Sequence, residues 1–243
     1  MMRILIPTAK EMNKKATAYD GLQLNPNSME IVNELAKLSV EDLAKVYKIK
    51  EDKAIEEFSR WQDINNNTAK SYKALELFNG LMYRNINRDN FDEADKKYVE
   101  GNVFITTSLY GVIGAYDLIQ EHRLDFLQNV KILGQSLKNF WRVSYDESIE
   151  GENFVVSLLS SEFEEVFSKE QREKFIKINF MEEKDGVLKV HSTISKKARG
   201  KFLTELVKNK VSSVEEMKKI QFDGFEFSNE HSEEKVLAFI AKK

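Results

Sequence analysis

The sequence contains no cysteine, which excludes disulfide bonds, thiolate metal sites and cysteine nucleophiles. It therefore offers no thiol for peroxide to oxidise, and the chain is not a cysteine-based redox sensor. Its three histidines, His122, His191 and His231, are too far apart to form a helical i, i+4 metal pair. We predict no metal site and no cofactor. An iron site assembled from carboxylates in three dimensions stays open as an alternative.

Long apolar runs are also missing. No run of eighteen apolar residues occurs, so the sequence has no candidate membrane span. The opening residues, MMRILIPTAKEMNKK, have only a short apolar stretch, whereas a signal peptide needs a longer run and a small-residue cleavage site. We therefore expect a cytoplasmic protein with no membrane partner.

The overall charge is not that of a typical DNA-binding domain. The 243 residues include 42% hydrophobic and 32% charged residues, which is typical of a globular chain, and the formal net charge is −3. Nucleic-acid-binding domains are usually strongly basic. Any contact with nucleic acid must therefore depend on positive charge that is concentrated locally.

The apolar pattern predicts a mixed α/β (α+β) fold: one domain, residues 1–243, with a central mixed sheet flanked by helices. A helix is expected over Met29–Leu38 with Ser28 as its N-cap, and another over Phe91–Glu100. Short apolar runs predict strands at Arg3–Pro7, Val103–Thr106, Asn153–Leu159, Phe175–Phe180, Gly186–Val190 and Val236–Ala241. No repeat and no Pro-rich or Ser-rich linker divides the chain.

The segment Ser39–Phe58 predicts two helices around a tight hairpin, in outline like a helix-hairpin-helix unit. Such units direct backbone N–H groups of the hairpin at DNA phosphates and usually carry glycine there. Lys48 stands where that glycine is expected, with Lys50 two residues later. The missing glycine favours a plain helical hairpin as the alternative.

The stretch SKKARGKF, Ser195–Phe202, concentrates positive charge. Ser195 is a natural N-cap, which predicts a helix from Lys196 to about Asn209. Cations in the first turn oppose the helix macrodipole, and a bound anion would compensate for them.

The helical wheel separates these cations into two sets. Lys197, Lys201 and Lys208 share one face and predict a solvated stripe that serves solubility. Arg199 falls on the apolar side, where its guanidinium needs either an internal carboxylate or a ligand phosphate. Gly200 is costly inside a helix and indicates the close approach of another backbone or of a ligand.

Several segments of the chain resemble a known protein family. KKARG, Lys196–Gly200, is similar to the signature of the YaaA family of peroxide-stress proteins. Further segments resemble the family in the same order: ILIPTAK (Ile4–Lys10), LFNGLMY (Leu77–Tyr83), LYGVIGAYDLIQEHRLDF (Leu109–Phe126), NFW (Asn139–Trp141), SLLSSEF (Ser157–Phe163) and GFEFSNEHSEEKVLAFIAKK (Gly224–Lys243). The resemblance spans nearly the whole chain.

The resemblance implies a cytosolic protein linked to peroxide stress and to lowering free intracellular iron. It also implies an α/β fold with a cationic cleft and a helix-hairpin-helix element, and binding to duplex or distorted duplex DNA. It strengthens the helix-hairpin-helix interpretation of residues 39–58. One departure is that Gly114–Ala115 replaces the family's Arg-Pro, so one expected cleft cation is missing.

The residues expected to bind phosphate or nucleic acid are Lys10, Tyr110, Arg123, Lys196, Lys197, Arg199, Lys201, Lys48 and Lys50. The expected supporting residues are Asp117, Asp125, Ser160, Glu162, Ser195 and Gly200. Asp117 and Asp125 are candidate internal partners for Arg123 and Arg199. We expect DNA as the partner and a monomeric chain.

An enzyme is the alternative. A small phosphate-bearing substrate would lie at the Ser195 helix start, held by Lys10 and Arg199, with Glu162 or Asp117 as acid or base. The sequence has no P-loop, no G-x-S-x-G and no H-E-x-x-H motif, and the catalytic residues are unknown.

Overall fold

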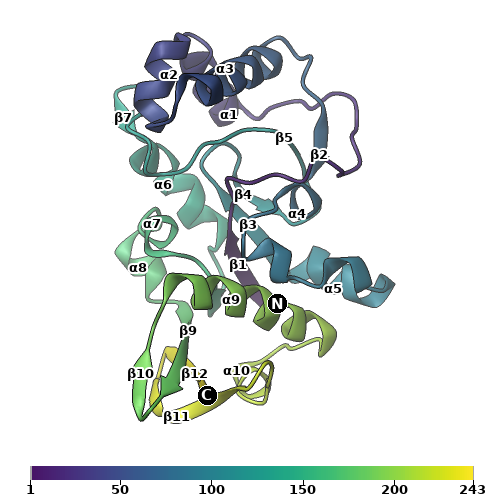
Figure 1. Cartoon of the computed structure of the whole chain (residues 1–243), viewed down its shortest axis with the longest axis vertical. Coiled ribbons are helices and arrows are strands. Elements are labelled where there is room, and N and C mark those ends of the chain that lie inside the picture. The colour runs from purple at the N-terminus through teal and green to yellow at the C-terminus, as the bar shows by residue number, and fades with distance from the viewer. Residues whose placement is uncertain (1, 243) are drawn as a thin grey trace.

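A central mixed sheet with helices around it forms the molecule, as the computed structural model of residues 2–242 shows (Figure 1). The strand order is β11-β12-β9-β8-β1-β3-β4, and β10 pairs with β9. The strands of this sheet are β1 (Arg3–Pro7), β3 (Val103–Thr107), β4 (Gly111–Gly114), β8 (Val155–Ser157), β9 (Phe175–Lys184), β10 (Val187–Lys189), β11 (Phe225–Glu233) and β12 (Val236–Lys242). The predicted mixed α/β fold is confirmed.

Two short pairs of strands and a set of helices complete the fold. The pairs are β2 (Ser71–Lys73) with β5 (Leu118–Gln120), and β6 (Lys131–Ile132) with β7 (Gln135–Ser136). The helices are α1 (Pro26–Leu35), α2 (Val40–Tyr47), α3 (Glu51–Asn65), α4 (Ala74–Leu77), α5 (Glu93–Asn102), α6 (Leu137–Ser148), α7 (Ser161–Glu164), α8 (Lys169–Arg172), α9 (Ser192–Lys208) and α10 (Val214–Met217), with 3₁₀ turns η1 (Tyr83–Asn85) and η2 (Arg88–Asn90).

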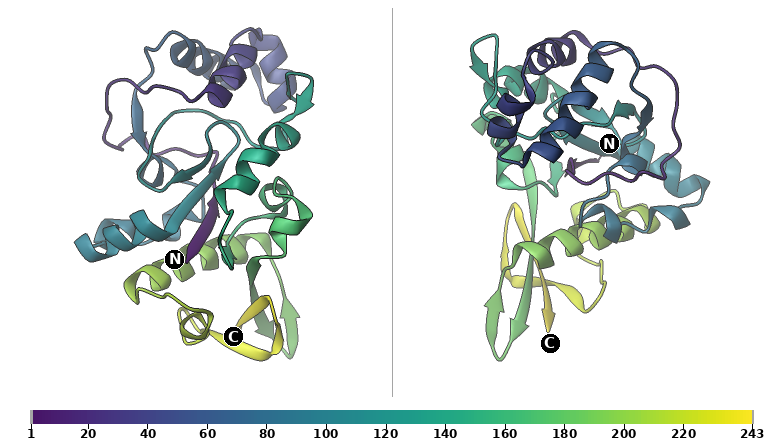
Figure 2. Two further views of the ribbon diagram at one scale, coloured as in Figure 1. Left: turned by 180° about the vertical axis from the view of Figure 1, so that it is seen from behind. Right: turned by 45° about the horizontal axis from the view of Figure 1, so that its top comes forward.

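The helices α1 to α3 lie at one end of the molecule and strands β9 to β12 project at the opposite end (Figure 2). Helix α9 crosses between them, against η1 and β9. Within residues 2–242, no helix combines the length and the apolar character that crossing a membrane requires.

Strand β1 occupies the middle of the sheet because its residues are apolar enough to be covered on both faces. Ile4, Leu5 and Ile6 are fully buried, as expected for a central parallel strand. The strand runs parallel to β3 on one side and to β8 on the other. The carboxyl ends of β1 and β8 therefore open at the same edge, where α/β folds usually place their ligand sites.

The first predicted helix begins earlier than the cap rule indicated. Helix α1 starts at Pro26, and the side chain of Asn25 accepts the N–H of Ser28 (2.8 Å). Ser28 is buried inside the helix, where its hydroxyl donates to the Leu109 carbonyl (2.8 Å). The prediction of Ser28 as N-cap was wrong because proline at the first helical position, with Asn before it, gives an equally good start.

The segment predicted as a helical hairpin, residues 39–58, contains α2 and the first half of α3, which continues to Asn65. Lys48 joins them in the left-handed conformation (φ 53°) that glycine adopts most readily. The N–H groups of Lys48 and Ile49 bond to the carbonyls of Lys45 (3.3 Å) and Ala44 (3.1 Å). These donors therefore close the end of α2. A DNA contact by this hairpin stays a prediction.

Candidate functional site

A pocket of about 600 Å³ opens at the carboxyl edge of the sheet. Its walls come from the loop that follows β1, the loop before η1, helix α7 with Ser160, and the first half of α9. Its lining residues are Pro7, Thr8, Ala9, Lys10, Glu11, Gly80, Leu81, Met82, Tyr83, Arg84, Leu127, Ser160, Glu162, Phe163, Thr193, Lys196 and Arg199. Among the predicted site residues, it brings together Lys10, Ser160, Glu162, Lys196 and Arg199.

Close backbone contacts fix these walls. The Tyr83 hydroxyl donates to the Pro7 carbonyl (2.8 Å), and a Cβ added at Gly80 would lie 2.8 Å from the Cβ of Ala9. A Cβ added at Gly200 would overlap the Met82 carbonyl oxygen and lie 2.9 Å from the Cβ of Asn85. The close approach expected at Gly200 is confirmed, and the approaching group is backbone.

Helix α9 starts at Ser192, four residues before the predicted start, so the assignment of Ser195 as its N-cap was wrong. His191 is the N-cap and has no side-chain cap bond, while the N–H of Ser195 donates to the His191 carbonyl (2.9 Å). The helix begins early because β10 ends at Lys189 and leaves only two connecting residues. Thr193, in the first turn, lines the pocket, and the positive end of the helix lies beside it.

Arg199 points inward, as the helical wheel predicted, but it finds no carboxylate partner. Within residues 2–242 its side chain makes no ion pair and no hydrogen bond, and its buried Nε is unsatisfied. Glu164 attracts the guanidinium, yet that carboxylate already binds Lys177 (2.7 Å) and the Ser157 hydroxyl (2.6 Å). Burial lowers the pKa of Arg199, which expresses the cost of an uncompensated buried charge.

The other cations of the pocket differ in whether they are paired. Lys10 forms an ion pair with the buried Asp125, and Arg84 pairs with Glu11. Lys196 is exposed and forms no ion pair with any residue of the described chain, 2–242. Lys196 and Arg199 are therefore the two pocket cations whose charge is available to a bound anion.

Glu162 is the acidic group of the pocket with a perturbed pKa. Burial is the main cause that raises its pKa, and the nearby negative charge of Asp125 adds to the effect. The Ser160 hydroxyl makes a long hydrogen bond to its carboxylate (3.5 Å). Across residues 2–242, no three metal-ligating side chains are grouped so that they could hold a metal ion.

Several predicted site residues lie outside the pocket. Tyr110 is buried, and its hydroxyl accepts the Gln120 N–H (2.9 Å). Asp117 accepts the Gly114 N–H (2.8 Å). Lys201 pairs with Asp223. Lys48 and Lys50 belong to the hairpin, Arg123 lies beside the buried Glu57 and Lys197 is exposed on α9.

The predicted pairing of Asp117 and Asp125 with Arg123 and Arg199 was wrong. Asp117 closes its own turn and Asp125 binds Lys10. Arg123 lies near Glu57, and its positive charge lowers the pKa of that carboxyl against the larger effect of burial. These partners come from distant parts of the chain, so sequence spacing could not reveal them. Gly114, where a cleft cation was expected, does not line the pocket.

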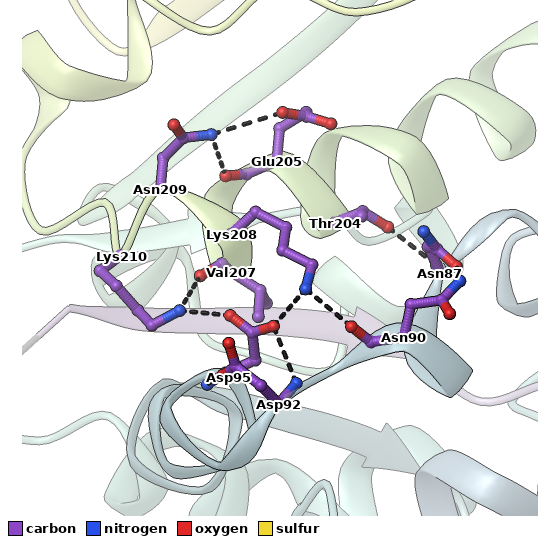
Figure 3. A network of polar contacts seen from close by, with 10 residues as sticks. All are labelled: Asn87, Asn90, Asp92, Asp95, Thr204, Glu205, Val207, Lys208, Asn209 and Lys210. Atoms are coloured by element: carbon purple, nitrogen blue, oxygen red, sulfur yellow. Dashed lines mark hydrogen bonds and ion pairs between the residues drawn. The ribbon is translucent and has the colours of Figure 1, made fainter.

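Lys208 is exposed, as expected for the solvated stripe, but it also has a structural role that the stripe did not predict. This lysine and Lys210 both bind the buried Asp95, and the Lys208 ammonium also donates to the Asn90 carbonyl (2.7 Å) (Figure 3). Asp95 accepts the Asp92 N–H as well (3.1 Å). Hydrogen bonds from the two lysines lower the pKa of Asp95 to about 2. This network joins α5 to the end of α9.

Sequence reasoning did not assign most of the other pocket residues to the site, Thr193 and Leu127 among them. Thr193 lies before the predicted helix start, and Leu127 follows the Asp125 that was taken as a supporting residue. A second cavity of about 660 Å³ lies elsewhere and is lined by Lys15, Lys73 and Arg88 together with Glu76 and Glu100. Its Arg88 is satisfied by the Phe78 carbonyl (2.8 Å) and that of Leu75.

These features define an α/β protein with a cation-lined pocket at the carboxyl edge of its sheet. The sequence profile of the family described as "Peroxide stress protein YaaA" matches residues 2–231. The chain belongs to this family. It is also similar to UPF0246 proteins of Streptococcus pneumoniae serotypes 2 and 4, each 48% identical over 239 residues, which cover 98% of this chain and 99% of the relative.

Proposed function

We propose that this peroxide stress protein binds DNA through the pocket and the adjoining face of α9, and thereby helps to limit iron-dependent oxidative damage. The observation that carries the proposal is Arg199, a largely buried guanidinium without a carboxylate partner among residues 2–242. A phosphate would supply the missing charge and hydrogen-bond acceptors. The link to iron rests on the family resemblance alone. The cytoplasmic location rests on that resemblance and on the absence of a signal-peptide pattern, and a monomeric chain is part of this proposal.

The surroundings of Arg199 also favour an anionic ligand. The uncapped start of α9 presents backbone N–H groups near Thr193, and Lys196 adds a second free cation. Contacts of this kind attract the DNA backbone and carry little sequence information. We therefore expect binding that is weakly sequence-specific and strongly dependent on salt.

The experiment measures affinity for a labelled duplex at several salt concentrations. Lys196→Gln combined with Arg199→Met should lower the affinity at least about tenfold and reduce the salt slope by about 2, because two phosphate contacts are lost. Lys184→Gln combined with Lys189→Gln removes the same charge from exposed positions outside the pocket and serves as the control. Equal affinity of wild type and the pocket variant would refute this site.

A second candidate function is an enzyme that acts on a small phosphate-bearing or nucleotide-like substrate. The observation that favours it is Glu162, whose raised pKa suits a proton-transferring group beside Arg199 and Lys196. A thermal-shift screen of nucleotides and phosphate monoesters would give a rise in Tm for any substrate that binds the folded state. Turnover lost in Glu162→Gln with binding retained would support the enzyme. No shift at millimolar ligand would exclude it.

A further inference from the structure

An exposed leucine lies at the mouth of the pocket. Leu127 retains 66% of its accessible surface, although it is one of the residues that line the pocket. The other exposed large apolar residues of the described chain do not line the pocket; they are Tyr19, Met29, Ile55, Leu133, Val143, Val187 and Val190. Single exposed apolar residues are ordinary on protein surfaces, so what distinguishes Leu127 is its position beside the cationic pocket.

The loop that carries Leu127 is firmly anchored. Its neighbours Leu124 and Phe126 are buried, and the Phe126 ring packs edge-on against Phe163 with 5.5 Å between ring centroids. The Leu127 N–H donates to Asp125 Oδ1 (2.8 Å), and Asp125 is held by Lys10. The exposure of Leu127 is thus imposed by a packed loop, so its side chain is presented at a fixed place.

The pocket behind Leu127 is larger than a backbone phosphate needs. Its volume of about 600 Å³ falls in the range of about 300–1,000 Å³ that accommodates small organic ligands. Apolar groups of Leu81, Met82 and Phe163 share the lining with the polar groups of Ser160 and Glu162. Such a lining matches a nucleobase, which combines an apolar face with hydrogen-bonding edges.

Arg199 is recessed, and this position restricts which phosphate can reach it. Its Nε is buried and the guanidinium lies inside the pocket lining. The phosphates of an intact duplex stand on the outside of a stiff, wide rod. A nucleotide that has left the stack can instead carry its phosphate and base inward.

We propose that the pocket receives one nucleotide turned out of a DNA duplex, and that Leu127 enters the stack at the place the base has left. The nucleotide's phosphate meets Arg199 and Lys196, and its base lies against Met82 and Phe163. Apolar wedges are a general way to stabilise such an unstacked step. This inference rests on the proposed DNA binding and specifies the form of DNA that the pocket takes.

The test uses duplexes that carry 2-aminopurine, a base whose emission rises when it leaves the stack. One duplex is fully paired and the other has the probe in a mismatch. At saturation, the wild-type protein should raise the emission several-fold. Its affinity for the mismatched duplex should be about tenfold higher than for the paired duplex, because less stacking is lost at a mismatch. Leu127→Ala should abolish most of both effects and, because the nucleotide then no longer reaches Arg199 and Lys196, should also lower the affinity for the paired duplex several-fold.

Leu133→Ala is the matched control, because Leu133 has 67% exposure and lies outside the pocket. It should behave as the wild type does. DNA binding without a change in emission, or equal effects of Leu127→Ala and Leu133→Ala, would overturn this inference and leave the proposed DNA binding intact. Absence of any DNA binding by the wild type would overturn both proposals.

Discussion

The cations in the two halves of helix α9 differ in whether they have carboxylate partners. Near the carboxyl end, Lys208 joins Lys210 in binding Asp95, which is almost entirely buried. In the amino-terminal half of the helix, Lys196 and Arg199 line the pocket and have no carboxylate partner among residues 2–242. The unpaired Arg199 and the paired Lys208 thus lie on one helix, less than three turns apart.

This difference separates structural charge from charge that is available to a ligand. A lysine that satisfies a buried aspartate stabilises the fold and has little to offer a ligand. A desolvated arginine without a partner destabilises the fold unless something else binds it. The contrast predicts that substitutions at one end change stability, whereas substitutions at the other change binding.

The largest effect is expected at Gly200, which fixes α9 against residues 82–85 between the two ends. Gly200→Val places a side chain on the Met82 carbonyl oxygen, and neither backbone segment can move away easily. We expect the free energy of unfolding to fall by about 3 kcal/mol in urea denaturation. Lys197→Val, exposed on the same helix, should cost only about 0.5 kcal/mol, and similar losses in both would contradict the close contact.

Asp95→Asn tests the satisfied end. It removes the charge that both lysines bind and should lower the free energy of unfolding by about 2 kcal/mol. Glu93→Gln, in the same helix, breaks only the exposed pair with Lys96 and should cost less than about 0.5 kcal/mol. Equal effects of the two substitutions would show that the network adds nothing to stability.

The same network predicts a pH dependence. Because the pKa of Asp95 is about 2 in the folded protein and close to 4 when unfolded, its contribution is complete above pH 4. It disappears as the pH falls from about 4 to 2, since the unfolded state then takes up protons first. In acid denaturation, Asp95→Asn should remove this part of the stability loss, and an unchanged profile would argue against it.

A reciprocal pair of substitutions tests the contrast directly. Arg199→Met keeps the apolar stem but removes the unpaired charge, so stability should stay equal or rise by about 1 kcal/mol while DNA affinity falls. Lys208→Met should lower stability by about 1 kcal/mol and leave DNA affinity unchanged. Thermal unfolding measures the stability of both variants, and DNA titration measures their affinity. Loss of binding in both would remove the distinction between the two ends.

The smallest effect is expected at Lys201, which lies between these cases. It is paired with Asp223, but both side chains are about half exposed. Lys201→Gln should change the free energy of unfolding by less than about 0.5 kcal/mol and DNA affinity by less than twofold. A clear loss of affinity would show that the DNA-binding face of α9 reaches as far as Lys201.

Local patterns in the sequence predicted the sheet and part of the site. RILIP is apolar and closed by proline, and it forms the central strand β1 with the predicted bounds. The periodicity of α9 correctly turned Arg199 inward. Strand β11 and helix α6 were missed. The β11 residues Phe225–Glu233 are largely polar and exposed, so the apolar pattern that marks a buried strand is absent there.

The pairing of charges could not be predicted because it depends on long-range contacts. Asp95 lies 113 positions before Lys208 in the chain, and nothing in the local sequence joins them. In the same way, Asp125 was assigned to an arginine although the chain brings Lys10 to it. Sequence spacing shows which side of a helix a cation occupies, whereas the tertiary fold decides whether that cation finds a partner.

The central position of β1 also has a consequence for the rate of folding. Leu5 pairs with Phe104 on one side and with Ser157 on the other. Strand β1 therefore cannot form its parallel ladders until these much later segments of the chain have been synthesised. Parallel pairings between such distant segments close large loops and are slow to form. Until β8 arrives, the apolar strand has an open edge on which other chains can pair. The protein should therefore refold more slowly, and aggregate more readily at high concentration, than a helical protein of its size.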